Sequence, residues 1–335
     1  MKIYIWTVLL LGATACATAY QAGAATNSDY HVPAQTNDGW PVGTLSEAAI
    51  DSTLIIQMLG QIHSNKYQGI NSVLLARNGT LVVEEYFGSF DRDSLHNMKS
   101  AAKSITSALV GIAIDQGFIQ SVDAKLLPYF PEYDGSIDNW DGRKEDITLK
   151  HLLSMTSGIK GNEDAMYPTN DWIKFYLDQP LVAAPGDTFS YATGGVVTLG
   201  NVITRASDLR IPDFANRYLF GPLGITVYHW PITNSRGSQG LAMTGGGLSL
   251  RPRDMAKFGQ LYLNGGTWKG HRVVSENWIA ESTSKQTTSD LYGEDFGYLW
   301  RMLDREVGGE SIRSYEAWGN GGMVDSTSWC FPHSI

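Results

Sequence analysis

The chain has 335 residues, with 25 Lys or Arg and 34 Asp or Glu, so its formal net charge at neutral pH is −9. This length and an apolar fraction of 43% exclude a disordered, collagen-like or coiled-coil protein, and they allow one large domain or two lobes around a substantial core. The acidic balance argues against nucleic acid as a partner, because contact with phosphates needs a basic surface.

The N-terminus has the order of a secretory signal peptide. Lys2 is followed by an apolar run over residues 3–11 and then by small residues. We predict that residues 1–24 are this signal, with residues 22–24 or 15–17 as the cleavage site. The apolar run is too short for an ordinary membrane span, and no later stretch of the sequence is long and apolar enough for one. We therefore expect an exported protein, either periplasmic or secreted.

Two alternatives remain for this N-terminus. Cys16 could carry a lipid anchor, or the apolar run could be a buried helix. After removal of the signal only Cys330 would remain, so no intrachain disulfide is expected in spite of the oxidising compartment.

The elements up to the first buried helix follow from local patterns. Residues 25–43 are polar and contain Pro and Gly, which is typical of a linker. Thr44 and Glu47 form a capping-box pattern at the start of a helix. The apolar face expected for this helix is Ile50, Leu54, Ile55, Met58 and Ile62. Residues 72–87 surround Asn78-Gly79 and predict a β-hairpin.

A helix over residues 100–116 is apolar nearly all round and is therefore expected to be buried, with Gly117 closing it. The later chain alternates helical patches with Gly/Pro loops. Helices are predicted at 149–155, 171–177, 196–206, 251–264 and 275–282, and strands at 298–303 and 311–318.

The sequence Ser-x-x-Lys occurs three times, at Ser100/Lys103, Ser157/Lys160 and Ser282/Lys285, where chance predicts about one. The tetrapeptide alone is therefore weak. Ser157 stands at the end of a helical pattern and Ser282 in a polar stretch expected on the surface. Ser100 differs because it opens the buried helix.

Residues three apart on a helix share a face, so Lys103 can reach Ser100 and act as its base. The positive potential of a helix N-terminus would also favour a developing oxyanion. The alternative is that Ser100 only caps the helix and Lys103 lies on the surface. HExxH, a Cys pair for zinc, GxGxxG and a Walker loop are all absent, and the seven His have no ligand spacing, so we expect neither a metal nor a cofactor.

The segment His96–Gly111 resembles the nucleophile helix of serine β-lactamases and penicillin-binding proteins. It is most similar to the class C β-lactamase-related branch of esterases and amide hydrolases. Further segments that resemble this family in kind and order are His151–Gly158, Pro185–Tyr191, Gly245–Met255 and Ala317–Gly322. The resemblance covers roughly residues 70–325.

The resemblance implies roles for individual residues. Ser100 would be the acylated nucleophile, Lys103 its base, and Tyr191 the second general acid and base. The backbone N–H groups of Ser100 and Met323 would form the oxyanion hole.

Two further positions bear on the substrate. The family often has Asn in Tyr-x-Asn, where this chain has Thr193, and it often has Lys-Thr-Gly, where this chain has Asn320-Gly321-Gly322. Thr193, Asn320, Gly321 and Gly322 would line the substrate site, with Tyr167 and Asp171 as weaker substrate contacts. An uncharged Asn320 provides no cation for a substrate carboxylate, so the expected substrate is a small neutral ester or amide.

Two alternatives stay open for the function. The first is a β-lactamase or D-Ala-D-Ala carboxypeptidase, whose substrates carry that carboxylate. The second, from another class, is an inactive binding relative or a truncated fragment.

The fold implied is a mixed α/β, serine β-lactamase/transpeptidase-like one, with an antiparallel sheet flanked by helices. Residues 44–125 and 241–335 would form the sheet-containing lobe, and residues 126–240 a mostly helical lobe. The last strands and helix of the family look missing, because Pro332 and the polar residues 325–328 make a poor central strand. The hairpin would then stand apart from the strand that bears Asn320.

Overall fold

The computed structural model describes residues 7–9, 30–232, 240–291, 293–307, 309–319 and 328–332, and the account below concerns these residues. The α-helices are α1 (Ser52–His63), α2 (Ala102–Asp115), α3 (Leu149–Leu153), α4 (Glu163–Met166), α5 (Trp172–Asp178), α6 (Thr193–Ser207), α7 (Ile211–Ala215), α8 (Pro252–Leu263) and α9 (Glu276–Ser282). The strands are β1 (Thr7–Leu9), β2 (Ser72–Arg77), β3 (Thr80–Tyr86), β4 (His96–Asn97), β5 (Tyr228–His229), β6 (Ser249–Leu250), β7 (Thr267–Trp268), β8 (His271–Arg272), β9 (Thr287–Thr288), β10 (Asp295–Phe296), β11 (Arg301–Val307), β12 (Glu310–Trp318) and β13 (Ser328–Pro332).

Six strands form the main sheet in the order β1–β13–β12–β11–β10–β9. Neighbouring strands are antiparallel except β1 and β13, which are parallel. The predicted strand at 311–318 matches β12, whereas β11 begins three residues later than the predicted start at 298. Leu299 explains the late start, because its φ of 61° is left-handed and does not fit a strand.

The expectation that the chain after Gly322 lacks a usable strand is wrong for residues 328–332. These residues form β13, which pairs with β12 on one side and with β1 on the other. Pro332 is the last residue of the strand, where its missing N–H disturbs the ladder least. Residues 7–9 of β1 lie inside the predicted signal peptide, so removal of that segment would leave the outer edge of β13 without this partner.

The hairpin predicted around Asn78-Gly79 is confirmed as β2 and β3. Both turn residues have positive φ, 51° and 78°, as the mirror-image hairpin turn requires. Among the described residues, the two strands form a sheet of their own. This agrees with the expectation that the hairpin stands apart from the strand leading to Asn320.

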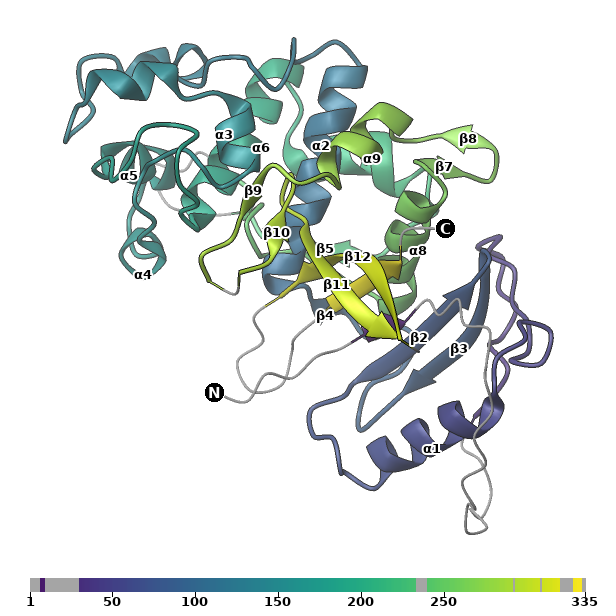
Figure 1. Ribbon diagram of the computed structural model, residues 1–335. Coiled ribbons are helices and arrows are strands. Elements are labelled where there is room, and N and C mark those ends of the chain that lie inside the picture. The colour runs from purple at the N-terminus through teal and green to yellow at the C-terminus, as the bar shows by residue number, and fades with distance from the viewer. Residues whose placement is uncertain are drawn as a thin grey trace.

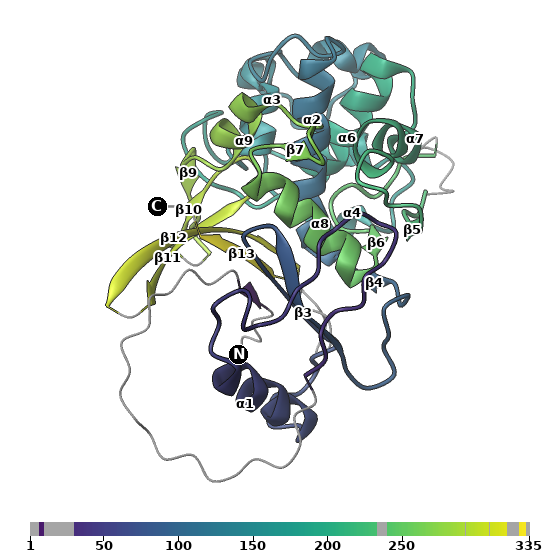
Figure 2. The ribbon, with the colours of Figure 1, turned by 90° about the vertical axis from the view of Figure 1, so that its right-hand side faces the viewer.

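The buried helix is also confirmed. α2 lies in the interior, with the helices of residues 126–240 on one side and the main sheet on the other, while α1 lies at the opposite end of the molecule beyond the hairpin (Figures 1 and 2). The side chains of α2 are buried from Ala102 to Ala113. Its N-terminal end therefore lies between the helical region and the sheet, where a substrate cleft is expected.

The start of α1 differs from the prediction. Thr44 and Glu47 do make the reciprocal capping bonds, but they close a turn, because Ala49 has a left-handed φ of 52° and interrupts the chain. The cap of α1 is Asp51, whose carboxylate accepts from the Thr53 amide.

The apolar face of α1 also differs from the expected one. Leu54 is 64% exposed, whereas Ile55, Leu59 and Ile62 are buried. The later helix start does not explain this difference, because it leaves the spacing of the residues unchanged. The buried face of Ile55, Leu59 and Ile62 is instead set by how the helix packs against its neighbours.

Residues 30–43 differ from a linker, because they pack against the hairpin. The Trp40 side chain is buried and its Nε1 donates to the Gly79 carbonyl at 2.9 Å. Val42 forms a bridge with Leu81 of β3. The aromatic and apolar residues within this polar stretch therefore attach it to the fold.

Among the described residues, none of the helices combines the length and apolar character that a membrane span needs. The same residues contain no cluster of three or more His, Cys, Asp or Glu side chains suited to a metal ion.

Candidate active site

The local structure before Ser100 turns the chain sharply into α2. β4 pairs with β6, and the Met98 amide donates to the Leu248 carbonyl at 2.8 Å. Lys99 then adopts a left-handed φ of 49°, which is uncommon for a residue with a side chain and recurs at functional sites. A short 3-10 turn, Lys99–Ala101, carries Ser100 and leads directly into the helix.

Two other segments lie against this turn, and the closer of the two contacts requires a glycine. At Gly319, just after β12, an added Cβ would lie 2.2 Å from the Met98 carbonyl oxygen. At Gly246 it would lie 3.4 Å from the Lys99 carbonyl. The end of β12 and the loop before β6 therefore both reach the nucleophile turn.

Ser100 and Lys103 form a contact pair. The Lys103 Nζ donates to the Ser100 Oγ at 3.0 Å and to the Gly245 carbonyl at 2.5 Å. The Lys103 side chain is only 3% exposed, while Ser100 is half-buried. A serine that solvent can reach thus has a buried amine at hydrogen-bond distance, the arrangement that an activated nucleophile needs.

Tyr191 lies next to this pair. The Lys103 Nζ lies 5.0 Å from the centroid of the Tyr191 ring, and Tyr191 is half-buried. The structure thus brings together the three residues that the resemblance assigned to catalysis, Ser100 and Lys103 from the start of α2 and Tyr191 from the segment before α6.

Thr193 does not have the position expected for a substrate contact. It is 1% exposed, and its methyl group packs so closely that a Cβ on Gly245 would lie 2.4 Å from it. Its place in the first turn of α6 turns the side chain into the interior instead of the cleft.

Asp171 likewise has a structural role. It caps α5 by accepting from the Lys174 amide at 2.9 Å, and the Tyr133 hydroxyl donates to both of its carboxylate oxygens. Because these bonds already engage both oxygens, we do not include Asp171 in the proposed site.

Tyr167 remains close to the catalytic group. It is 45% exposed and packs edge-on against Trp172. Burial of part of the ring, followed by the nearby charge of Glu163 and the proximity of Tyr191, raises the pKa of Tyr167 to about 12. Its hydroxyl therefore stays protonated at neutral pH and can donate a hydrogen bond to a ligand.

The remaining predicted site residues, Asn320, Gly321, Gly322 and Met323, lie outside the described residues. Their assignment to the cleft wall and the oxyanion hole stays a prediction.

The other two Ser-x-x-Lys sequences do not form such a pair in the structure. Ser157 is buried and bonded to the Tyr176 hydroxyl at 2.7 Å, while Lys160 is exposed. Ser282 is fully buried, contrary to the expected surface position, and Lys285 pairs with Asp295. Ser282 is buried because α9 packs this face against the core.

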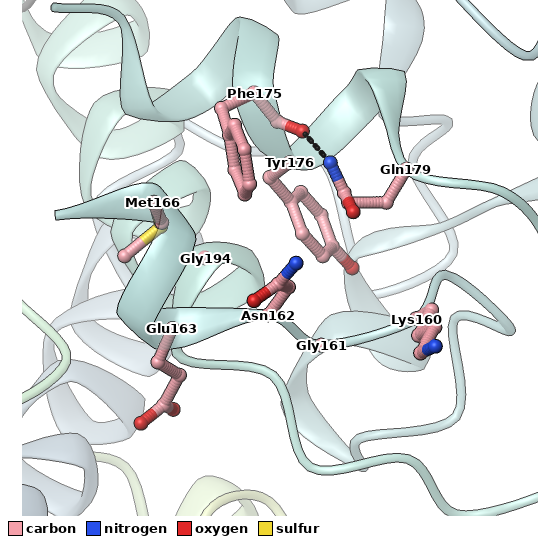
Figure 3. Close-up of a pocket in the computed structure, with 9 residues that line it drawn as sticks. All are labelled: Lys160, Gly161, Asn162, Glu163, Met166, Phe175, Tyr176, Gln179 and Gly194. Atoms are coloured by element: carbon pink, nitrogen blue, oxygen red, sulfur yellow. Dashed lines mark hydrogen bonds between the residues drawn. The ribbon is translucent and has the colours of Figure 1, made fainter. Parts of the chain in front are cut away.

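A small pocket lies beside the catalytic group, on the side of α4, α5 and α6 (Figure 3). Its lining residues are Lys160, Gly161, Asn162, Glu163, Met166, Phe175, Tyr176, Gln179 and Gly194. It has room for about one water molecule and includes none of Ser100, Lys103 and Tyr191. It is therefore not itself the substrate site.

Sequence reasoning missed two residues that contact the Tyr191 segment. The Glu163 Oε1 accepts from the Thr193 amide at 3.1 Å, and the Met155 Sδ accepts from the Ala192 amide at 3.4 Å. The sequence held one indication of such contacts, in Tyr-Ala-Thr-Gly-Gly at the start of α6. Ala192 cannot cap a helix with its own side chain, so the capping acceptors had to come from other segments.

Comparison with known proteins agrees with this geometry. The sequence model of the family described as Beta-lactamase matches residues 63–332. The chain belongs to the Beta-lactamase family.

Two curated relatives are similar over part of their length. The 6-aminohexanoate-dimer hydrolase of Paenarthrobacter ureafaciens is 27% identical over 245 residues, which cover 68% of this chain and 60% of that protein. Protein flp of Staphylococcus aureus (strain N315) is 27% identical over 182 residues, 49% of this chain and 35% of that protein. The chain thus spans less than two thirds of the length of these relatives.

Solved structures confirm the mixed α/β fold expected of this family. The octameric penicillin-binding protein homologue from Pyrococcus abyssi has a TM-score of 0.65 at 18% identity, covering 82% of this chain and 69% of that one. The D-stereospecific amidohydrolase from Streptomyces sp. has a TM-score of 0.56 at 16% identity, covering 71% and 78%.

Proposed function

We propose that this member of the Beta-lactamase family is a serine hydrolase that cleaves a small ester or amide through an acyl-enzyme. The observation that carries the proposal is the 3.0 Å contact between the buried Lys103 Nζ and the Ser100 Oγ at the entrance of α2. Tyr191 beside Lys103 supplies the second acid and base that a two-step reaction needs.

In the first step the Ser100 Oγ attacks the substrate carbonyl carbon, and its proton passes to a neutral Lys103. The Ser100 amide, with that of Met323, donates to the oxyanion. Tyr191 gives its phenolic proton to the leaving group as the carbonyl–heteroatom bond breaks, and it regains a proton from Lys103. The products are an acyl-Ser100 ester and a free alcohol or amine.

In the second step water attacks the acyl carbon. Tyr191 and Lys103 take the water proton and return one to the Ser100 Oγ as its bond to the acyl group breaks. The net reaction adds one water molecule to the substrate, and the enzyme is regenerated without a cofactor.

The preference for a neutral substrate rests on Asn320, which is uncharged where the family often has a lysine. The relative named 6-aminohexanoate-dimer hydrolase supports extending the substrates from esters to amides. Export to the periplasm or medium is a separate proposal that rests on residues 1–24, and N-terminal sequencing of the mature protein tests it.

The proposal is tested by labelling with a fluorophosphonate, followed by peptide mapping. We expect the label on Ser100, and we expect Ser100→Ala to lose ester hydrolysis by several orders of magnitude with an unchanged circular dichroism spectrum. Ser157→Ala is the matched control, since it removes the serine of a second Ser-x-x-Lys sequence and should keep the label. If Ser100→Ala kept more than about a tenth of the parent activity, the assignment would be wrong. An unlabelled, folded protein would instead favour an inactive binding relative.

A further inference from the structure

The helix that follows Tyr191 begins without a cap of its own. α6 has 15 residues, and its N-cap position is Ala192, whose side chain forms no capping bond. The first amides of a helix have no partner within it, so acceptors must come from elsewhere. Tyr191 directly precedes the N-cap residue, so the acceptors that bind the first amides of α6 also hold the Tyr191 backbone in place.

Two distant segments hold the chain around Tyr191. The Met155 carbonyl accepts from the Ser190 amide at 2.7 Å, and its Sδ accepts from the Ala192 amide. Met155 does this from a left-handed φ of 59°. On the other side, an added Cβ at Gly161 would lie 2.2 Å from the Tyr191 carbonyl oxygen. The backbone of Tyr191 is thus enclosed from both sides.

Glu163 provides the charged part of this enclosure. Its Oε1 accepts from the Thr193 amide at 3.1 Å, two residues after Tyr191. A carboxylate there also interacts favourably with the positive end of the 15-residue helix. Figure 3 shows the Glu163 carboxylate pointing away from the Tyr176 ring. It therefore acts on the α6 terminus instead of filling the small pocket.

We propose that Glu163 is a positioning residue for the catalytic tyrosine. Its carboxylate caps α6 from a separate segment and so fixes Tyr191 beside the Lys103 Nζ. Proton donation to a leaving group depends on the placement of the donor, so a displaced Tyr191 loses its effect as an acid even though the residue is still present. This inference rests on the proposed function, because it assumes that Tyr191 is the acid.

The experiment compares two esters of the same acid with different leaving groups. p-Nitrophenolate leaves without a proton, whereas an ethoxide leaving group needs one. In Glu163→Ala we expect kcat/KM for the ethyl ester to fall about 10- to 100-fold more than kcat/KM for the p-nitrophenyl ester. Glu163→Gln keeps an oxygen acceptor for the Thr193 amide and should stay within about threefold of the parent for both esters. Asp164→Asn, at the exposed neighbouring acid of α4, is the matched control.

The outcomes separate this inference from the proposed function. Equal losses for the two esters in Glu163→Ala would overturn the positioning role, since a merely loosened fold lowers both. A loss in Glu163→Gln as large as in Glu163→Ala would also overturn it, because the glutamine keeps the oxygen that accepts from the Thr193 amide. Tyr191→Phe should show the same ester selectivity as Glu163→Ala. If Tyr191→Phe has no effect, Tyr191 is not the general acid and the proposed function is wrong on this point. If Tyr191→Phe has the expected effect and Glu163→Ala has no effect, only the positioning role of Glu163 is wrong.

Discussion

Lys99 shows how single residues shape this site. Its left-handed backbone places Ser100 at the entrance of α2, and Gly319 lets the end of β12 approach that turn. A lysine rarely adopts such a φ, so nothing in its residue type indicates the conformation. The surrounding contacts impose it.

Asn320 should make the enzyme prefer substrates without a carboxylate. Short p-nitrophenyl esters should be hydrolysed much faster than cephalosporins, because the chain offers no cation at this position for the cephalosporin carboxylate. Asn320→Lys should shift the selectivity toward carboxylate-bearing substrates by about 1–2 kcal/mol, the value of one charge-assisted hydrogen bond. The ratio of kcat/KM for the two substrate classes measures this, and efficient cephalosporin hydrolysis by the parent would contradict it.

The residues of the site differ in how far the sequence alone could predict them. Ser100 lies three residues before Lys103, in the 3-10 turn that leads into α2, so their contact follows from helical spacing. Tyr191 was placed only by resemblance. Glu163 and Met155 act through contacts between segments that are far apart in the chain, and no spacing indicates such contacts. Thr193 is buried in the structure, which the resemblance could not indicate because it compares residue types and not the direction of a side chain.

At the scale of elements, α2 is held by close packing as well as by apolar residues. An added Cβ at Gly111 would lie 2.3 Å from the Trp278 ring of α9. The absence of a side chain there is what allows α9 to pack against α2. Local patterns predicted element boundaries poorly where tertiary contacts set them. An example is α1, which begins after the cap at Asp51.

Gly111→Ala should therefore destabilise the protein by about 1–3 kcal/mol through overpacking, although Ala is the better helix former. Gly60→Ala is the control, because Gly60 lies in α1 and an added Cβ there would have no neighbour within 4 Å. That change should stabilise the protein by about 0.5–1 kcal/mol. Urea unfolding measures both free energies, and equal signs for the two variants would contradict the packing argument.

At the scale of the whole molecule, buried charges connect three regions. The Arg253 guanidinium on α8 bonds to Asp38 of the N-terminal segment and to Glu84 of β3, both within 2.8 Å. Lys257, one turn further along α8, pairs with Asp254 at 3.0 Å. All of these side chains are largely buried, so removing one partner leaves a charge that water cannot readily reach.

Burial alone would raise the pKa of the Asp38 carboxyl, but hydrogen bonds from Arg253 and from the Trp40 amide hold it well below its usual range. A carboxyl with a lowered folded pKa adds stability above its unfolded pKa, and this stability is lost as the pH falls toward the folded pKa. Asp38→Asn should therefore cost about 1–3 kcal/mol at pH 7.

The difference between parent and Asp38→Asn should shrink as the pH falls below about 4, the unfolded pKa of an aspartate. Chemical unfolding across this pH range measures it. Asp93→Asn is the control, since Asp93 pairs with Arg251 at the surface and such pairs contribute little. A constant difference from pH 7 to pH 2 would show that the charge of Asp38 is not involved.

Within the described part of the chain, the buried apolar residues form two clusters, and the hairpin belongs to both. Leu74 and Leu81 face the main core, whereas Leu75 and Val82 pack with α1 in a smaller cluster. Amide hydrogens of α1 should then exchange with deuterium through a local opening, at a lower free energy than those of α2. Since Ser100, Lys103 and Tyr191 lie outside the smaller cluster, the protein could keep hydrolysing substrate while α1 is detached. Loss of protection in α1 and loss of turnover should therefore occur at different denaturant concentrations.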